Sequence, residues 1–299
     1  AGLVFPYAAP DRPAMTDRSP PDRLTCLRGG TIHTFDADGA VHEDGELWMS
    51  GAGILSVGPR GAFRPPEGAA GAVDYIDLPG RTVIPGLINA HTHSYSALLK
   101  GTVEKEPLDI YMIAVIAAGA AMTPREIYVA AQLDALAMLH TGTTAAIDHY
   151  SERPALSGEG LAAVQSAFGD IGLRATVATM FADKPYIDTI PVDRGALPPD
   201  VVAAAENYTP PDAASYFAIM EDAVSNEAPG ARVRAILGVD GPQRCSDLLL
   251  EMTGDFQQRH HCGLHTHMLE TKTQAAMRPA NGPGFVRRMA DLGILDERS

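Results

Sequence analysis

Residues 83–101 read VIPGLINAHTHSYSALLKG, an apolar run that ends in two histidines spaced two residues apart. Alternate residues of a β-strand point to the same side, so His91 and His93 are expected to present both imidazoles on one face of a strand end. Such a pair is half of a metal site, although a histidine pair beside a turn is equally often a solvated or hydrogen-bonded detail. The rest of the chain has to decide between these interpretations.

From Thr82 onward, short apolar runs alternate with longer segments that carry apolar residues at helical spacing. The runs, each of which predicts a strand, are residues 82–91, 143–150, 173–181, 232–240 and 262–270. The segments that predict helices are residues 123–142, 158–172, 211–228 and 246–261. Strands alternating with helices predict a parallel sheet covered by helices, either a barrel or an open doubly wound sheet. The strand-end histidines favour the barrel, because a barrel gathers the C-terminal ends of its strands around one mouth.

The predicted helices have recognisable ends. Thr123 is a suitable N-cap for the first of them, and Gly142 follows its last turn. His140 lies in that last turn, where a cation complements the helix dipole, so a structural role is expected for it. The same role is expected for His260 and His261 at the end of another helix.

The region before Thr82 has a different sequence pattern, without the long helical segments. Three segments, residues 23–35, 45–58 and 73–86, are rich in Val, Ile, Leu and Thr and are separated by Gly, Asp and Pro turn signals. We therefore expect a flexible tail over residues 1–22, a small β domain over residues 23–82 and the barrel over residues 83–299.

The composition excludes several classes of function. The chain has 299 residues and 45% hydrophobic content, enough to bury a large core. Its 23 basic and 37 acidic residues give a net charge of −14, which repels a phosphate backbone or an anionic membrane face, so neither nucleic acid nor membrane is an expected partner. The 3 cysteines form no CxxC pair, and the first twenty residues do not resemble a secretory signal, which predicts a cytoplasmic protein.

A second histidine motif, GLHTHMLET, occupies residues 263–271 at the end of the fifth predicted strand. His265 and His267 share one face, and Glu270 follows three residues after His267, beyond the strand end. A metal ligand beside an acid–base group is the arrangement that metal-assisted hydrolysis requires.

The motifs VIPGLINAHTHS and LHTHMLET resemble the amidohydrolase superfamily, and within it the cytosine deaminase-like and triazine hydrolase-like branch. The resemblance extends from about residue 24 onward and includes LHTGTTAAIDHY and GPQRCS. It implies an α/β fold, a distorted (β/α)8 TIM-like barrel of which about five units are present, with part of a small β-sandwich before it. It also implies one divalent metal ion, with zinc expected first and iron as the alternative.

The resemblance assigns roles by motif position. His91 and His93 are implied as metal ligands from the first strand, His267 as the ligand from the fifth, and Glu270 as the proton shuttle. His265 lies one layer deeper in the barrel and is expected to be structural or to contact substrate rather than metal. The expected substrate-binding residues are Tyr95, His149, Gln243 and His265, with Met180 as a further pocket residue, although His149 is equally compatible with an ordinary hydrogen-bonded role.

The implied activity is hydrolysis or deamination at C–N bonds of a small heterocyclic or amide substrate by metal-activated water. Binuclear branches of the superfamily resemble each other in a carboxylated lysine at the end of the fourth strand, which this chain lacks, so one metal is expected. Purine deaminase-like members commonly have histidine after Gly-Pro, where this chain has Gln243, which puts an aminopurine nucleoside substrate in doubt. A homo-oligomer is compatible with the resemblance.

The resemblance also implies a histidine from a sixth strand and an aspartate from an eighth. The five predicted units occupy Thr82 to Ser299, and three more would need roughly 130 further residues. We therefore expect the chain to be the first two-thirds of an amidohydrolase. The alternatives are a catalytically inactive fragment or pseudoenzyme without those two residues, and a non-catalytic binding protein that reuses the barrel.

Overall fold

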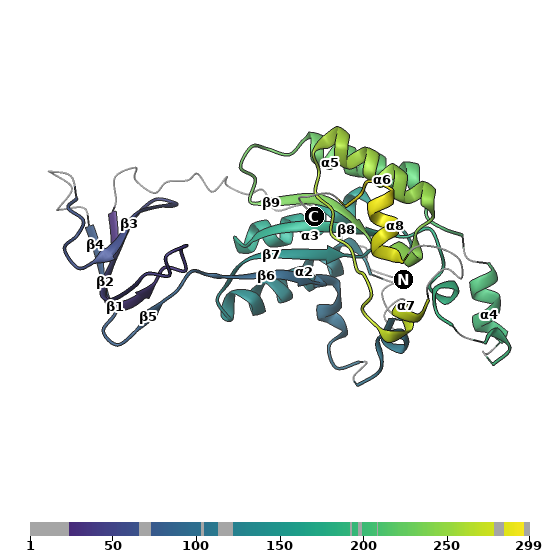
Figure 1. Cartoon of the computed structure of the whole chain (residues 1–299), viewed down its shortest axis with the longest axis horizontal. Helices are drawn as coiled ribbons and strands as arrows, with labels where there is room; N and C mark the ends of the chain where they lie inside the picture. Colours follow the sequence, from purple (N-terminus) through teal and green to yellow (C-terminus); the bar gives the residue numbers. More distant parts are fainter. Residues whose placement is uncertain are drawn as a thin grey trace, which may run out of the picture. The chain divides into compact units, whose positions relative to one another are not determined.

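The computed structural model describes residues 24–65, 73–102, 105–112, 122–191, 193–196, 199–207, 209–277 and 284–295 (Figure 1). The tail expected over residues 1–22 lies outside these residues. The chain divides into two compact units, the first ending at Gly86 and the second beginning at Leu87.

The first unit contains one mixed β-sheet. Its strands are β1 (Leu24–His33), β2 (Val41–Ser50), β3 (Gly53–Pro59), β4 (Val73–Asp77) and β5 (Thr82–Val83), in the order β3-β2-β1-β4 with β5 also beside β1. β1 is antiparallel to β2 and parallel to β4 and β5. Leu24, Cys26 and Trp48 form its buried core. Among the described residues this unit has a single sheet, and the second layer of the expected sandwich is not among them.

The second unit is built on a four-stranded parallel sheet. Its strands are β6 (Leu87–Thr92), β7 (Thr143–Tyr150), β8 (Arg174–Phe181) and β9 (Val233–Val239), in the order β6-β7-β8-β9 (Figure 1). The helices α2 (Pro124–His140), α3 (Gly158–Ile171) and α5 (Ala213–Ser225) lie between successive strands in the chain, and α6 (Asp247–His260) follows β9. Each strand is therefore added beside the previous one through a helical crossover, as the alternating pattern predicts.

The predicted fifth strand, residues 262–270, is wrong in extent. It makes one isolated parallel bridge, Leu237 to Leu264, so it meets β9 at a single point. The backbone N–H of His265 donates to Leu237 O, and that of His267 donates to Asp240 O. The segment advances two residues while its partner advances three, so the regular ladder is broken and the segment leaves the sheet as a loop.

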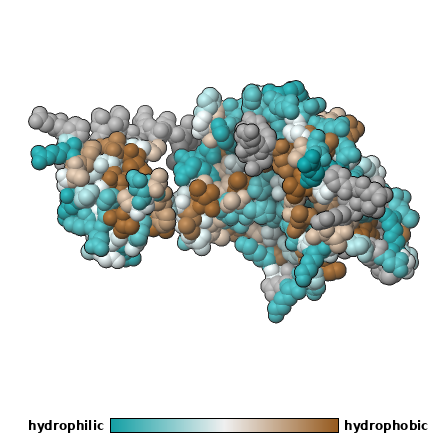
Figure 2. Space-filling view, in the orientation of Figure 1, coloured by the Kyte–Doolittle hydropathy of each residue, from teal (hydrophilic) through white to brown (hydrophobic). Residues whose placement is uncertain are grey.

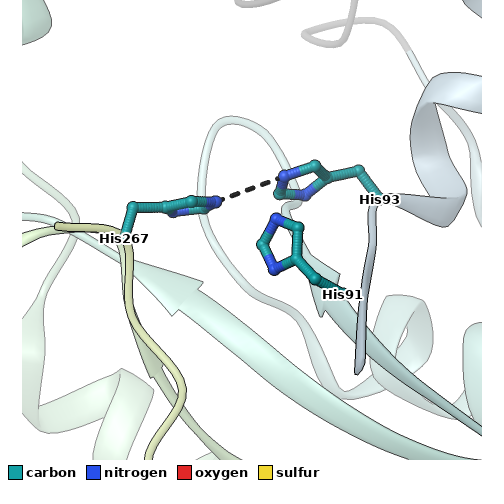
Figure 3. A group of neighbouring side chains, drawn as sticks. All are labelled: His91, His93 and His267. Carbon is teal, nitrogen blue, oxygen red and sulfur yellow. Dashed lines mark hydrogen bonds between the residues drawn. The ribbon is translucent and has the colours of Figure 1, made fainter. Parts of the chain in front are cut away.

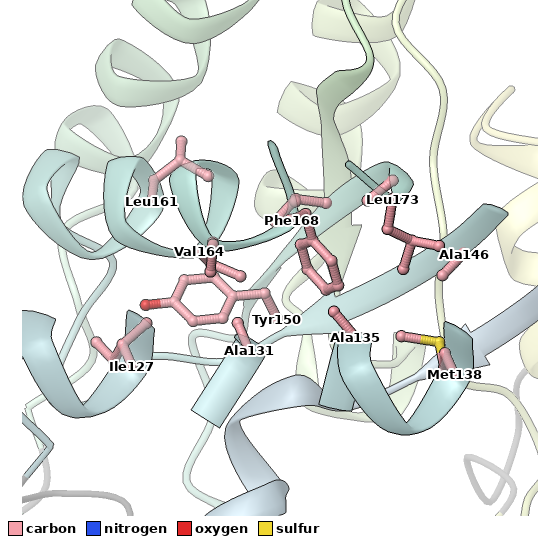
Figure 4. Packing of buried hydrophobic residues seen from close by; sticks show 13 residues of the cluster. Ile127, Ala131, Ala135, Met138, Ala146, Tyr150, Leu161, Val164, Phe168 and Leu173 are labelled. Carbon is pink, nitrogen blue, oxygen red and sulfur yellow. The ribbon is translucent and has the colours of Figure 1, made fainter. Parts of the chain in front are cut away.

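Helices α2 and α3 cover β7 and form the first core of this unit (Figure 4). Small side chains at Ala131 and Ala135 of α2 leave room for the large rings of Tyr150 and Phe168, which are fully buried. A second core lies where α5 and α6 pack on β9, around Met220, Leu237 and Phe256. The sheet is thus anchored by helices along the face that carries these residues.

The predicted start and end signals of α2 are confirmed. Thr123 Oγ1 accepts a hydrogen bond from the Glu126 N–H, and the Glu126 carboxylate accepts one from the Thr123 N–H, which completes a capping box. Gly142 follows the helix at φ +86°, a conformation that L side chains rarely adopt. The chain can therefore turn directly from α2 into β7.

Shorter elements complete the second unit. They are η2 (Ser94–Leu99), η3 (Tyr186–Thr189), η4 (Arg194–Ala196), α4 (Pro199–Glu206), η5 (Pro242–Arg244), α7 (Lys272–Ala276) and α8 (Phe285–Asp291). In the part of the chain that the structure describes, no helix combines the length and apolar character needed to cross a membrane.

Apolar side chains remain exposed in both units, as the brown areas of Figure 2 show for one face. In the second unit Leu87 and Ile88 of β6 are 51% and 74% exposed. Among the described residues β6 pairs only with β7, so its other edge is open. An open apolar edge of this kind is a place where further chain can add to the sheet.

Candidate metal centre

A β-bulge in β6 determines the direction in which the His91 side chain points. The pairing of β6 with β7 shifts between Asn89 and Thr92, so that β6 has one extra residue. Residues three apart in a regular strand face opposite sides, yet Asn89 and Thr92 both bond to side chains of α2. The extra residue allows this and leaves His91 facing away from α2. His93, just past the strand end, faces the same way, because the rings of His91 and His93 lie 4.7 Å apart between centres.

Asp148 of β7 fixes the turn that follows His93. Its carboxylate is fully buried and accepts hydrogen bonds from the Ser94 N–H at 2.9 Å and the Ser94 hydroxyl at 2.5 Å. Burial raises the pKa of Asp148 to about 7, against the opposing effect of these two bonds. The clamp holds the backbone one residue after His93, so the ring of His93 is positioned from β7 as well as from β6.

Five imidazoles cluster at the C-terminal ends of the strands: His91, His93, His149, His265 and His267. Eight of their ten ring pairs have centres 4.3 to 5.9 Å apart. Burial is the largest cause that lowers the pKa of each one, that of His93 to about 4. The rings are therefore neutral at pH 7, and each keeps one nitrogen lone pair. Neutral imidazole is the form that binds metal ions.

Backbone carbonyls determine which nitrogens face the centre of the cluster. His93 Nδ1 lies 2.8 Å from His149 O, and His267 Nδ1 lies 2.9 Å from Asp240 O. A carbonyl oxygen only accepts, so both Nδ1 atoms carry the proton. The two Nε2 atoms then hold lone pairs, and they face each other at 3.3 Å, the contact dashed in Figure 3. Two lone pairs at this distance cannot hydrogen-bond, whereas a cation between them would satisfy both.

The separation fits a metal ion. Nitrogens at 2.0–2.1 Å from a tetrahedral zinc lie about 3.3 Å apart. His91 adds a third ring nitrogen, and the ligand atoms of His91, His93 and His267 all lie within 4.8 Å of one another. Figure 3 shows these three rings converging from two separate segments of the chain. Three neutral imidazoles suit zinc and neighbouring divalent metals. A second group, His91, His149 and His265, meets the same distance limit.

A cavity of about 250 Å³ opens beside these rings. It brings together most of the residues that the sequence analysis assigned to the site: His91, His93, Tyr95, Gln243, His267 and Glu270, with Met180. The described lining does not include His149 or His265. His149 is fully buried beneath the cluster, with Nε2 3.2 Å from Gly238 O, and His265 lies beside His91.

Gln274 holds Glu270 and was not predicted. The Glu270 N–H donates to Gln274 Oε1 at 2.9 Å, and Gln274 Nε2 lies 3.4 Å from Glu270 Oε2. Gln274 is itself buried, and its own N–H donates to Thr271, the N-cap of α7. A signal was present, because Thr271 followed three residues later by Gln is a capping-box pattern.

The other wall of the cavity includes a buried ion pair that the sequence analysis did not assign. Arg244 of η5 pairs with Asp240, just after β9, and its guanidinium lies 5.3 Å from the ring centre of Tyr186. Asp240 is the residue whose carbonyl fixes the tautomer of His267. The ion pair therefore stiffens the backbone on which one candidate ligand depends.

The second unit thus combines an α/β fold with a histidine cluster at the C-terminal ends of its parallel strands. The profile of the Amidohydrolase family matches residues 82–297. The chain belongs to the amidohydrolase family.

The curated relatives include deaminases. The 5-methylthioadenosine/S-adenosylhomocysteine deaminase of Pelotomaculum thermopropionicum is 28% identical over 272 residues, which are 90% of this chain and 55% of that protein. The protein of the same name from Nitratidesulfovibrio vulgaris (Hildenborough) is 30% identical over 280 residues, 92% of this chain and 55% of that protein. The chain thus spans about half the length of these relatives.

Solved structures share the fold. Atrazine chlorohydrolase TrzN from Arthrobacter aurescens TC1, complexed with zinc, aligns with TM-score 0.70 and 21% identity over 90% of this chain and 58% of its own. An adenosine deaminase from Xanthomonas campestris with bound zinc aligns with TM-score 0.70 and 20% identity. The alignment covers 92% of this chain and 56% of that protein. The predicted α/β amidohydrolase fold is confirmed.

Proposed function

We propose that this chain carries the metal site and the proton-transfer group of a hydrolase that acts on C–N bonds of heteroaromatic small molecules, deamination above all. One observation carries the proposal: the lone pairs of His93 Nε2 and His267 Nε2 face each other at 3.3 Å, in a cavity that Glu270 also lines. A cation site beside a carboxylate is the minimum equipment for metal-assisted hydrolysis.

His91, His93 and His267 would hold one divalent ion, with zinc proposed first and iron second. When bound, such an ion supplies activation of water for attack at neutral pH. Residues 233–246, which include β9 and η5, contain no lysine, so this part of the site offers no carboxylated lysine to bridge a second ion. The preferred arrangement is therefore a single ion on three imidazoles.

Glu270 is the proposed proton shuttle. It lines the same cavity as His91 and His267, and its charge raises the pKa of both, in opposition to the lowering by burial. A carboxylate in this place can take a proton from the attacking water and pass it to a ring nitrogen or leaving group. Gln274, which bonds the Glu270 backbone and approaches its carboxylate, would orient it.

Gln243 is the residue that we propose recognises the substrate through a hydrogen bond. Its Oε1 is buried and has no hydrogen-bond partner among the described residues. A ligand N–H would remove the cost of that unpaired acceptor, and amino-substituted heterocycles offer such a group. Tyr95 and Met180 add an aromatic and an apolar surface to the same cavity. We assign His149 and His265 to the support of the histidine cluster rather than to substrate contact.

The substrate class is narrower than an arbitrary amide. The curated relatives are named as deaminases of methylthioadenosine and adenosylhomocysteine, and a structural neighbour is named as an atrazine chlorohydrolase. Aminopurine and triazine rings have one feature in common. In both, the leaving group is attached to a ring carbon that is bonded to a ring nitrogen. An aminopurine therefore stays among the candidates although Gln243 replaces the histidine expected for that class.

The test is an activity screen of the zinc-loaded full-length gene product with 5′-methylthioadenosine, aminopyrimidines and aminotriazines. The quantity measured is the ammonia released. We expect release from at least one of these classes, and release slower by about 10²- to 10⁴-fold from Glu270→Gln protein with the same zinc content. Zinc-loaded protein that releases no ammonia from any of them would contradict the proposed activity and favour an inactive metal-binding protein.

A further inference from the structure

We propose that His265 is a positioning residue for His91: it accepts a hydrogen bond from His91 Nδ1–H and so keeps His91 in the tautomer whose Nε2 faces the metal. This inference rests on the proposed metal site. It concerns a residue that neither binds the ion nor lines the substrate cavity among the described residues.

The contact between His91 and His265 has the geometry of an in-plane hydrogen bond. His91 Nδ1 and His265 Nε2 are 2.8 Å apart, the ring planes differ by 16°, and the ring centres are 5.1 Å apart. The ring centres are much further apart than the two nitrogens, and the ring planes are nearly parallel. The two rings therefore meet edge to edge at these nitrogens. The lone pair of one nitrogen therefore points along the N–H of the other.

The His93–His267 contact has a different ring geometry from the His91–His265 contact. Its ring centres are also 5.1 Å apart, although its nitrogens are separated by 3.3 Å rather than 2.8 Å. Rings meeting end to end at the longer nitrogen distance would have centres further apart. The rings of His93 and His267 are therefore turned so that their lone pairs converge to one side, as two ligands of one ion require.

The same comparison argues against a second metal site at His91, His149 and His265. Two nitrogens bound to one tetrahedral zinc lie about 3.3 Å apart. The 2.8 Å between His91 Nδ1 and His265 Nε2 is too short for that and suits N–H···N. This group of three is better explained as a hydrogen-bonded support than as a cation site.

The direction of the hydrogen bond follows from what each ring has to do. If His91 binds metal through Nε2, its proton must be on Nδ1, and His265 Nε2 must be the acceptor. All three proposed ligands then share one pattern, in which Nδ1–H donates to a fixed acceptor and Nε2 is bare. His93 and His267 use backbone carbonyls, whereas His91 uses a side chain.

His265 is itself fixed in place. Its backbone N–H donates to Leu237 O of β9 at 3.0 Å, and two residues later the His267 N–H donates to Asp240 O at 3.1 Å. The segment 265–267 therefore supplies one proposed ligand and orients another from β6. This links β6 to the far edge of the four-stranded sheet through one hydrogen bond.

The experiment measures zinc affinity by competition with a chromophoric chelator for the full chain and three variants. His265→Leu removes the acceptor, and we expect it to weaken binding by about 10- to 100-fold, the usual cost of losing an outer partner of a ligand histidine. His265→Gln restores most of the affinity, because its amide oxygen can accept where Nε2 did. His140→Leu, at the exposed end of α2, is the control and leaves affinity unchanged.

A long-range proton–nitrogen NMR spectrum of the zinc-bound wild-type chain gives a readout that needs no variant. We expect the proton of His91 on Nδ1. A proton on Nε2 would overturn the inference, as would equal affinity in His265→Leu, a Gln variant no better than Leu, or the loss of one of two bound zinc ions in His265→Leu. A wild-type chain that binds no zinc would instead contradict the proposed function itself.

Discussion

His93 Nε2 and His267 Nε2 face each other at 3.3 Å although they are 174 residues apart in the chain. Each ring is held by a carbonyl at a different strand end, His149 O near the end of β7 and Asp240 O just after β9. The C-terminal ends of the parallel strands thus set the tautomers of these two histidines as well as their positions. The two facing lone pairs repel each other, and a cation held between them would remove that repulsion.

Replacement of Glu270 by glutamine is expected to separate metal binding from catalysis. Glutamine keeps the size of the side chain and cannot take a proton, so kcat should fall by about 10²- to 10⁴-fold while zinc content stays the same. The measurement is ammonia release beside elemental analysis of the same sample. Glu251→Gln, on the exposed side of α6, is the matched control. A Glu270→Gln protein with more than a tenth of wild-type turnover would exclude the proposed shuttle.

The Asp148–Ser94 clamp is expected to stabilise the fold. Asp148→Ala leaves the buried Ser94 N–H and hydroxyl without their acceptor, which should lower the free energy of unfolding by about 1–3 kcal/mol. Urea unfolding of Asp148→Ala, Ser94→Ala and the double variant checks this, with exposed Asp38→Ala as control. The double variant should lose less than the sum of the single losses, and strictly additive losses would show that the two side chains do not act together.

Gly238 is expected to tolerate no side chain. A Cβ at this position would lie 2.7 Å from the carbonyl carbon of Ala178 and 2.8 Å from that of Thr179, both backbone atoms of β8. Gly238→Ala should therefore cost about 1–3 kcal/mol and lower Tm, because neighbouring strands must move apart. At Gly263 the nearest atom to a new Cβ is 3.5 Å away on Ile236, so Gly263→Ala is the control. Equal Tm values for the two variants would contradict this packing argument.

The local elements of the second unit were predictable from the sequence. The run 143–150 coincides with β7, and the cap at Thr123 marks the start of α2, because both signals depend on neighbouring residues. The histidines and Glu270 could be named as candidates from the sequence because their motif spacing is local as well. The strand predicted over 262–270 failed because its extent depends on pairing with β9, where the register slips after Leu237.

The parts of the site that the sequence did not reveal depend on long-range contacts. The bulge that turns His91 appears only in the pairing of β6 with β7. The role of Asp240 lies in its carbonyl, which carries no residue-specific signal. Arg244 meets Tyr186 across 58 residues of chain, and no spacing rule connects them. Gln274 alone had a local signal, in the cap of α7.

The most direct test of the central claim is zinc content and affinity of the chain, measured by elemental analysis after dialysis and by chelator competition. We expect one zinc per wild-type chain, and a Tm that falls when the ion is removed, because a ligand bound only to the folded state stabilises it. His93→Ala and His267→Ala should each lose the ion, while His140→Ala keeps it. Equal zinc in all four proteins, or none in the wild type, would contradict a metal centre on these histidines.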